Sequence, residues 1–322
     1  MPTDRQAAAP MPAEGTGAAQ VAILMCTRNG AQFIDEQLQS IAEQTHARWS
    51  LYVSDDDSTD ETVDIVRRFA EGRPQQLEIR SGPGKGACAN FLSLAVDPTI
   101  EGDFFAFSDQ DDIWHKEKLQ RGLDWLTTIP GDVPAFCCSR TELATIEGQI
   151  YDLSPLFTRK VGFGNAIIQS LGGANTIMFN RAAKRLVEKM GALDVVLHDW
   201  WIYQLVSAVG GAVRYDPQPT LKYRQHSNNE IGSNKGWYAR LVRMRMVFTG
   251  RFCEWNAKNT AALQKIPADL ITPENRRVLE LFSKARTSPL FQRLYYLKRS
   301  GVYRQTTLGN IGLWVAAVFK KI

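Results

Sequence analysis

Hydrophobic and polar residues alternate along the first half of the chain in blocks that predict strands followed by helices. Continuous apolar runs at residues 21–26 and 49–53 are typical of parallel strands that are buried on both faces. After each run, apolar residues return at helical spacing, at residues 33–41 and 62–69. This repeated order predicts a doubly wound, mostly parallel α/β sheet with right-handed crossovers.

The second half of the sequence departs from this order. Apolar runs at residues 135–143 and 177–179 predict shorter strands, which can run antiparallel around the edge of the sheet. A helix is expected at residues 199–209, followed by two short strands at 212–215 and 221–223. After Gly236 the pattern becomes helical, with basic residues between the apolar positions Leu241, Met244, Val247 and Phe248.

Composition limits the domain organisation and the classes of partner. A chain of 322 residues with 44% hydrophobic and 22% charged residues can form one large α/β domain or a domain with an appendage. The net charge of +4 is too small to indicate nucleic-acid binding, although basic residues predominate from Lys235 onward. We therefore expect a disordered leader at 1–19, an α/β domain at 20–233 and a basic, helical C-terminal extension at 234–322.

Cysteine content and apolar stretches bear on the cellular location. Five cysteines without a Cys-x-x-Cys pair indicate neither a disulfide framework nor a zinc site, so we expect a reducing cytoplasm. No stretch reaches the roughly 18 apolar residues of a spanning helix. The terminal segment 308–319, followed by Lys320 and Lys321, suits a helix lying on the inner face of the cell membrane. It equally suits a terminal helix docked on the domain.

Three carboxylates directly follow the apolar run at 103–108: Asp109, Asp111 and Asp112, with Gln110 between the first two. Like charges this close repel one another, so a compensating cation is expected. Mg²⁺ and Mn²⁺ take carboxylate oxygens and share them with substrate phosphates, and ligands of α/β sheets bind at the carboxyl ends of strands. The alternative is an acidic turn that begins the next helix.

Other loops exclude several nucleotide-binding classes. The acidic segment 55–60 lacks the glycine of a calcium-binding EF-hand loop. It can instead begin a helix and accept hydrogen bonds from a base or ribose. The segment 82–86 is glycine-rich without the P-loop pattern, and the turn at 26–30 lacks Gly-x-Gly-x-x-Gly. Neither a P-loop nucleotidase nor a Rossmann dehydrogenase is therefore supported.

Five motifs in order give the chain a resemblance to a known family. They are Cys26-Thr27-Arg28-Asn29-Gly30, the segment 53–60, the segment 108–114, His198-Asp199-Trp200-Trp201 and the segment 223–229. Together they resemble the family 2 glycosyltransferases of the GT-A fold, and within them the bacterial rhamnosyltransferase-like branch, over roughly residues 20–230. Two positions depart from that pattern: His198 stands where the family usually has Glu, and Gly173-Ala174-Asn175-Thr176 replaces a frequent Gly-Cys-Thr.

The resemblance implies a fold and a set of residue roles. The fold would be α/β, a GT-A type Rossmann-like mixed sheet flanked by helices, with a helical C-terminal extension. The implied roles are nucleotide-sugar binding by Thr27, Arg28, Asn29, Asp56, Asp109 and His226, metal ligation by Asp111, general base catalysis by Asp199, and acceptor stacking by Trp200 and Trp201.

Some of these roles have simpler alternatives. Thr27 and Asn29 can serve only to satisfy the turn backbone, and Arg28 can form a surface ion pair of small value. His226 can be a packed or solvent-facing histidine, and the Trp200–Trp201 pair can belong to the core.

The function implied is inverting, Mg²⁺- or Mn²⁺-dependent transfer of a sugar from a nucleoside diphosphate to a glycan or lipid-linked glycan acceptor in surface polysaccharide assembly. The branch favours L-rhamnose on deoxythymidine diphosphate, with uridine diphosphate as the other carrier. A metal-dependent phosphohydrolase or nucleotidyltransferase would also place Asp-x-Asp at a strand end, but it would not need the other four motifs. A non-catalytic carbohydrate-binding protein would show no dependence on a divalent ion.

Overall fold

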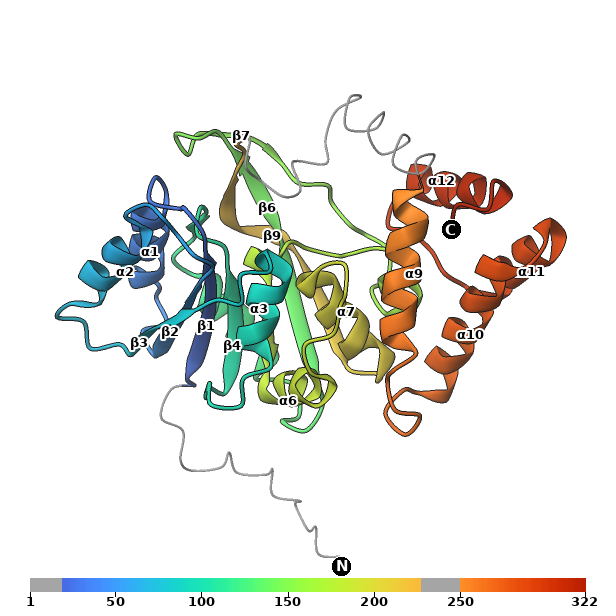
Figure 1. Ribbon diagram of the computed structural model, residues 1–322, viewed down its shortest axis with the longest axis horizontal. Helices are drawn as coiled ribbons and strands as arrows, with labels where there is room; N and C mark the ends of the chain where they lie inside the picture. Colours follow the sequence, from blue (N-terminus) through green and yellow to red (C-terminus); the bar gives the residue numbers. More distant parts are fainter. Residues whose placement is uncertain (1–18, 227–249) are drawn as a thin grey trace, which may run out of the picture.

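The computed structural model describes residues 19–226 and 250–322 (Figure 1). Within them, nine strands form one mixed sheet in the order β3-β2-β1-β4-β8-β6-β9-β5, with β7 paired to β6. The first four strands of that order are parallel, whereas β8 runs antiparallel to both β4 and β6. The strands are β1 (Val21–Thr27), β2 (Trp49–Asp55), β3 (Leu77–Ser81), β4 (Phe104–Ser108), β5 (Ile113–Trp114), β6 (Ala135–Ala144), β7 (Ile150–Leu153), β8 (Met178–Asn180) and β9 (Ala212–Arg224).

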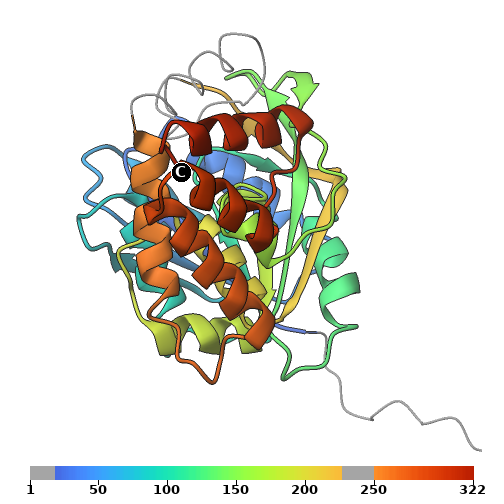
Figure 2. The same cartoon turned by 90° about the vertical axis from the view of Figure 1, so that its right-hand side faces the viewer.

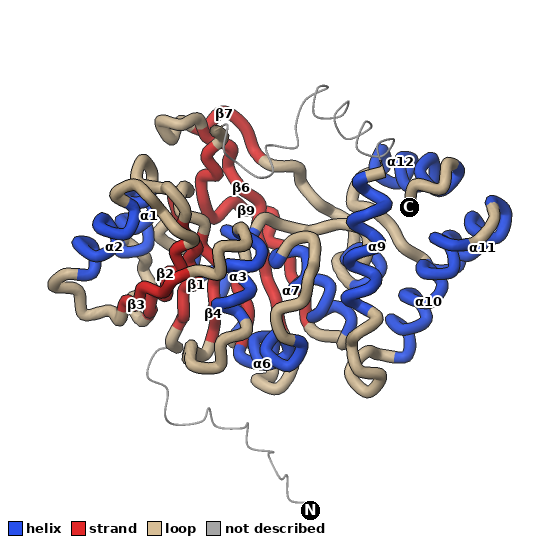
Figure 3. Tube along the Cα trace, viewed as in Figure 1, coloured by secondary structure: helices blue, strands red, loops and turns tan. Residues whose placement is uncertain are grey.

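Helices cover both faces of the sheet, as the strand–helix alternation predicted (Figure 3). The alternate residues Val21, Ile23 and Met25 of β1 pack with helices α1, α2 and α4, and the residues between them pack with α3, α6 and α7. Burial on both faces explains why β1 is continuously apolar. The bounds of these helices and of two short turns are α1 (Ile34–Ala42), α2 (Thr62–Ala70), α3 (Ala87–Ala95), α4 (Lys118–Leu126), α5 (Phe163–Ala166), η1 (Ala174–Thr176), α6 (Arg181–Met190) and α7 (His198–Ala208).

The strand β9 differs from the expectation of two short strands at 212–215 and 221–223. It is one strand of 13 residues that lies parallel to β6, with register shifts opposite Ser139 and Arg140. Pro217 and Pro219 interrupt the apolar pattern in its middle. Proline has no backbone N–H to donate to a neighbouring strand. The sequence therefore predicted a break between two strands, where the structure has one bent strand.

The C-terminal region is helical, as expected, and stands at one side of the sheet (Figures 1 and 2). Its helices are α9 (Arg251–Leu263), α10 (Pro273–Thr287), α11 (Leu290–Ser300) and α12 (Thr307–Val318). Leu263, Phe282 and Ala317 belong to the same buried cluster as Trp201 and Leu205 of α7. These helices therefore share one core with the sheet.

Three expectations fall outside the described residues. They are the leader at 1–19 (described only from residue 19), the division at 233/234, and the helical segment carrying Lys235, Arg240, Arg243 and Arg245. Among the helices that the structure does describe, none is long and apolar enough to cross a membrane. None of the five cysteines, all of them in described segments, forms a disulfide.

Candidate functional site

The loops after β2, β1 and β4 meet at one edge of the sheet, because these strands are neighbours and run in the same direction. Gln110, in the loop after β4, contacts the loop after β1 at this edge. Its Oε1 accepts from the Arg28 backbone N–H at 2.9 Å, and its Nε2 donates to the Arg28 carbonyl at 3.0 Å. The Gln110 side-chain amide thus bonds both backbone polar groups of Arg28. The guanidinium of Arg28, which is exposed, is not used in this contact. Sequence reasoning treated Gln110 only as the spacer of Asp-x-Asp.

The turn after β1 also bonds the loop after β2, on its other side. Asn29 adopts a left-handed conformation with φ 47°. Its backbone N–H donates to Ser58 Oγ at 2.8 Å, and its Oδ1 accepts from the Thr59 backbone N–H at 2.8 Å. A Cβ on Gly30 would lie 2.2 Å from Oε1 of Gln110. Only glycine therefore lets Gln110 reach Arg28.

Thr27 also has a local partner. Its hydroxyl donates to Asp55 Oδ1 at 2.6 Å, and the same oxygen accepts from Ser58 Oγ at 2.6 Å. Thr27 is buried. The side chains of Thr27 and Asn29 thus build the turn that carries Arg28.

The Asp56 carboxylate lies buried inside the glycine-rich loop. Its Oδ1 accepts from the Gly84 backbone N–H at 2.6 Å, and its Oδ2 accepts from the Gly86 N–H at 3.0 Å. Gly84 and Gly86 have φ values of +66° and +85°, which side chains rarely adopt, and a Cβ on Gly82 would lie 2.7 Å from Asp56 Oδ1. The glycine-rich segment 82–86, which lacks a P-loop pattern, therefore binds the Asp56 carboxylate through its backbone N–H groups.

Asp111 contacts a residue that lies 115 positions later in the sequence. Nε2 of His226 lies 2.8 Å from Asp111 Oδ2, and the imidazole stacks on Phe33 with ring centroids 5.0 Å apart. Arg224, which is buried, binds the Glu36 carboxylate, and its guanidinium carbon lies 5.3 Å from the Phe33 ring centroid. The end of β9 is in this way fixed to the start of α1.

The remaining acids of the motif lie close by. Burial, and after it the charges of Asp109 and Asp56, raises the pKa of the Cys26 thiol at the end of β1. Burial, followed by the charges of Asp111 and Asp109, raises the pKa of Asp112 well above its ordinary value. Asp112 accepts from the Asn175 amide. Asn175 belongs to the segment Gly173-Ala174-Asn175-Thr176, which this contact places beside the acidic motif.

Asp111 and His226 suit a hard divalent ion that takes its remaining ligands from water or substrate. Residues 19–226 and 250–322 contain no group of three or more His, Cys, Asp and Glu side chains that could hold a metal alone. The Asp111–His226 pair offers two ligand atoms 2.8 Å apart. Adjacent ligands of an octahedral ion bound at 2.0–2.1 Å lie about 3 Å apart, and Mg²⁺ typically takes one or two protein ligands plus substrate phosphates. The pair therefore fits such an ion.

Asp199 lies at the first turn of α7, partly exposed, with its Oδ1 accepting from the Trp200 N–H at 2.5 Å. The adjacent His198 packs this turn against β4, the strand that precedes the acidic motif at 109–112. Its ring stacks on Phe91 with centroids 4.0 Å apart and meets the edge of Phe107 in β4 at 5.1 Å. A carboxylate at a helix N-terminus is stabilised in its ionised form, which suits a general base.

Trp200 and Trp201 are core residues in the structure. Both are buried, and the Trp200 indole N–H donates to the Ala166 carbonyl at 2.6 Å. Neither indole presents a face to an acceptor sugar, so the expected stacking role is not supported. An aromatic pair beside a candidate catalytic residue has the same sequence pattern whether it faces a ligand or the core.

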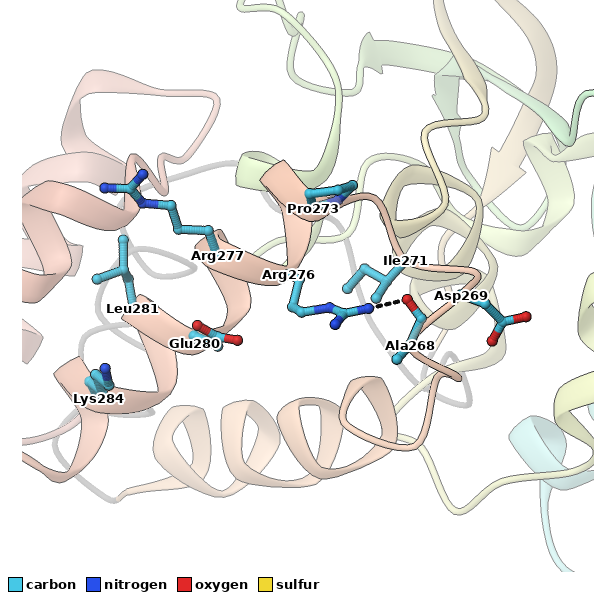
Figure 4. Close-up of a pocket in the computed structure, with 9 residues that line it drawn as sticks. All are labelled: Ala268, Asp269, Ile271, Pro273, Arg276, Arg277, Glu280, Leu281 and Lys284. Carbon is cyan, nitrogen blue, oxygen red and sulfur yellow. Dashed lines mark hydrogen bonds between the residues drawn. The ribbon is translucent and has the colours of Figure 1, made fainter.

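A separate hollow of about 600 Å³ lies on the outer side of α10 (Figure 4). It carries charges of both signs, including Arg277, Lys284 and Glu280, and Arg276 in its wall binds the Ala268 carbonyl. None of its lining residues comes from the loops that hold the strand-end carboxylates. It is not part of the candidate active site.

Comparison with known proteins decides the family. Residues 22–186, about half of the chain, match the model of Glycosyl transferase family 2. The chain belongs to this family. It is 32% identical over 253 residues to "dTDP-rhamnosyl transferase RfbG" of Shigella flexneri, covering 76% of this chain and 85% of that protein. It is 24% identical over 221 residues to "Putative teichuronic acid biosynthesis glycosyltransferase TuaG" of Bacillus subtilis, covering 68% and 83%.

Solved structures confirm the fold. The mannosyltransferase PcManGT from Pyrobaculum calidifontis, in complex with GDP-Man and Mn²⁺, superposes with a TM-score of 0.53 at 18% identity, covering 95% of this chain and 88% of that one. TarS residues 1–349 from S. aureus, in complex with UDP-GlcNAc, gives 0.52 at 14% identity, covering 88% and 89%. The family 2 chain has the GT-A fold and is a rhamnosyltransferase-like hexosyltransferase.

Proposed function

We propose that this glycosyltransferase moves L-rhamnose from a deoxythymidine diphosphate carrier to a growing surface glycan, with inversion at the anomeric carbon and with help from Mg²⁺ or Mn²⁺. The observation that carries the proposal is the Asp111–His226 pair, 2.8 Å apart at the strand-end edge of the sheet. The sugar and its carrier come from the relative named dTDP-rhamnosyl transferase.

Asp56 would select the nucleotide base. Its carboxylate is buried and held in place by Gly84 and Gly86, each oxygen accepting one backbone hydrogen bond. A carboxylate oxygen can accept a second hydrogen bond, here from the imide N–H of thymine or uracil. A cytosine ring offers an acceptor at that position and would be repelled. Asp109 follows β4, which lies on the other side of β1 from β2, and would face the ribose and the diphosphate.

Asp111 and His226 would hold the divalent ion with the donor diphosphate. A bound ion of this kind neutralises the charge that develops on the leaving diphosphate. Phe33 fixes the plane of the His226 ring by stacking, and Gln110 fixes the backbone of Arg28. The exposed Arg28 guanidinium would then contact a phosphate oxygen.

Asp199 would accept the proton of the acceptor hydroxyl. A positioned carboxylate contributes about 10²–10⁴-fold through such proton transfer. One base suffices for a single displacement, which inverts the anomeric centre without a covalent sugar–enzyme intermediate. The acceptor would be a glycan or a lipid-linked glycan; one relative, at 37% identity over 100 residues, is named for a diphosphoundecaprenol-linked acceptor.

A donor panel tests the proposal. Purified protein is given dTDP-L-rhamnose, UDP-glucose, UDP-GlcNAc or GDP-mannose together with glycolipid acceptors, with Mn²⁺ or with EDTA. We expect nucleoside diphosphate to be released from dTDP-L-rhamnose, more with acceptor and only with metal, and we expect a product of inverted anomeric configuration by NMR. Preferred turnover of the GDP-linked donor would contradict the proposed deoxythymidine diphosphate carrier.

A further inference from the structure

The outer side of α12 is an exposed apolar face. The helix Thr307–Val318 contains no charged residue. Leu313, Ala316 and Ala317 are buried against the domain. The side chains that remain outside, with their exposed fractions, are Leu308 (64%), Ile311 (55%), Trp314 (40%), Val315 (40%), Val318 (46%) and Phe319 (60%). We call these six residues the α12 outer face.

A helix docked on a soluble domain ordinarily turns polar residues to water. Large contiguous apolar surfaces mark sites of interaction with proteins or membranes. Leu308, Ile311 and Val315 follow one another at helical spacing, so they form a stripe along one side of α12. The absence of charge from this stripe therefore calls for a partner.

The helix is held rigidly, so this face is not a frayed end. Arg293 of α11 donates to the Ala317 carbonyl at 2.8 Å, and the Lys321 backbone N–H donates to the Ala316 carbonyl at 2.7 Å. At the other end, the Thr306 hydroxyl accepts from the Gly309 N–H at 3.0 Å. A partner would meet a surface that is already ordered.

The chain segment that contains this face carries charge of one sign. Residues 281–322 contain eight Lys and Arg residues and no Asp or Glu. Lys320 and Lys321 directly follow the helix, and Lys298 and Arg299 end α11. An apolar stripe beside cationic residues complements a surface that is apolar within and anionic outside, which describes the headgroup region of an anionic bilayer.

We propose that the α12 outer face docks on anionic membrane, with the helix lying in the plane of the headgroups. Its 12 residues span about 18 Å, too little to cross a hydrocarbon core of about 30 Å. Figures 1 and 2 place α12 at the same end of the molecule as β7, the end toward which β1 runs. Docking would bring the strand-end site toward a lipid-borne acceptor; this consequence rests on the proposed function, whereas the docking does not.

Vesicle flotation of the full chain, without donor or acceptor, tests the docking. Vesicles contain either phosphatidylcholine alone or phosphatidylcholine with phosphatidylglycerol. Ile311→Ser/Val315→Ser removes part of the stripe, and Lys320→Gln/Lys321→Gln removes charge. Phe291→Ser is the matched control: Phe291 is 86% exposed, but it lies two residues from Arg293 and so about 160° around α11 from the side chain that reaches α12.

We expect native protein to float with the anionic vesicles. The serine pair should weaken partitioning by about tenfold or more, and each lysine removed should weaken it about fivefold at low salt. Phe291→Ser should bind as the native protein does. Circular dichroism and thermal melting establish that each variant is folded.

Three results would overturn the proposal: no flotation of native protein at low salt, equal loss in Phe291→Ser, or a native dimer that Ile311→Ser/Val315→Ser dissociates without any effect on vesicles. The last result would show that a second copy of the chain covers the face. Because flotation needs no turnover, its outcome is separate from that of the donor panel.

Discussion

Acidification should destabilise this enzyme through one buried histidine. His198 is enclosed by Phe91 and Phe107, and neither of its ring nitrogens has a hydrogen-bond partner within the described part of the chain. Burial lowers the pKa of His198 from 6.5 to about 3. The ring is therefore neutral in the folded protein and takes up a proton on unfolding at any pH between these values.

The sign and size of the effect follow from that pKa. Below pH 6.5 the unfolded chain binds more protons at this residue than the folded chain, so the free energy of unfolding falls as the pH falls. With a folded pKa of about 3, the loss is about 2 kcal/mol at pH 5 and about 4 kcal/mol at pH 3. Above pH 6.5 the residue makes no further contribution to pH dependence.

The variant His198→Phe isolates this effect from that of the carboxylates. Phenylalanine keeps an aromatic ring against Phe91 and removes two buried polar atoms that lack partners, whose burial costs about 1–3 kcal/mol each. We expect the variant to be at least as stable as the native protein at pH 7.5. Between pH 7.5 and pH 5 it should lose about 2 kcal/mol less than the native protein.

Urea unfolding, followed by circular dichroism at both pH values, measures the difference. Equal losses in the native protein and the variant would refute the argument, because they would mean that the His198 ring is solvated or protonated in the folded state. The same comparison tests whether position 198 is enclosed in the core. In this structure the position belongs to the core beneath the site.

Three further predictions concern the strand-end loops. Gly30→Ala should break the contact of Gln110 with the first turn and weaken donor binding at least tenfold, whereas Gly131→Ala, with nothing within 4 Å of the added carbon, should not; equal affinities in calorimetry would contradict the assigned contact. Asp56→Asn should weaken binding of deoxythymidine diphosphate by about 1.5–3 kcal/mol, and unchanged affinity would remove Asp56 from base recognition. Asp199→Asn should lower turnover about 10²–10⁴-fold at unchanged donor affinity; a native turnover number would rule out the base.

The sequence predicted the fold well where burial is on both faces. The apolar runs of β1 and β2 identified the central strands almost to the residue. The two-residue strand β5 and the bend in β9 were not predicted, because so short an element and a proline-interrupted strand carry no periodicity. Pairing to β9 and to β6, rather than local propensity, defines them.

Sequence reasoning singled out the charged residues of the candidate site but missed the residues that position them. Asp109, Asp111 and Asp56 stand out because carboxylates at strand ends are costly without a partner. Gln110 and the Arg224–Glu36 contact do not stand out, because their roles depend on segments 82 and 188 residues away. For Trp200 and Trp201 the sequence left both an acceptor role and a core position open; their neighbours, which only the structure reveals, place them in the core.

Metal-dependent binding of the donor product tests the central claim most directly, since it needs no knowledge of the acceptor. Calorimetry compares the affinity for deoxythymidine diphosphate in Mn²⁺ with that in EDTA, for native protein and for Asp111→Asn. We predict that Mn²⁺ tightens binding to the native protein at least tenfold, and that Asp111→Asn loses this increment while keeping the affinity measured in EDTA. Equal affinities of the native protein in Mn²⁺ and EDTA would contradict the assignment of a metal–diphosphate site to Asp111 and His226.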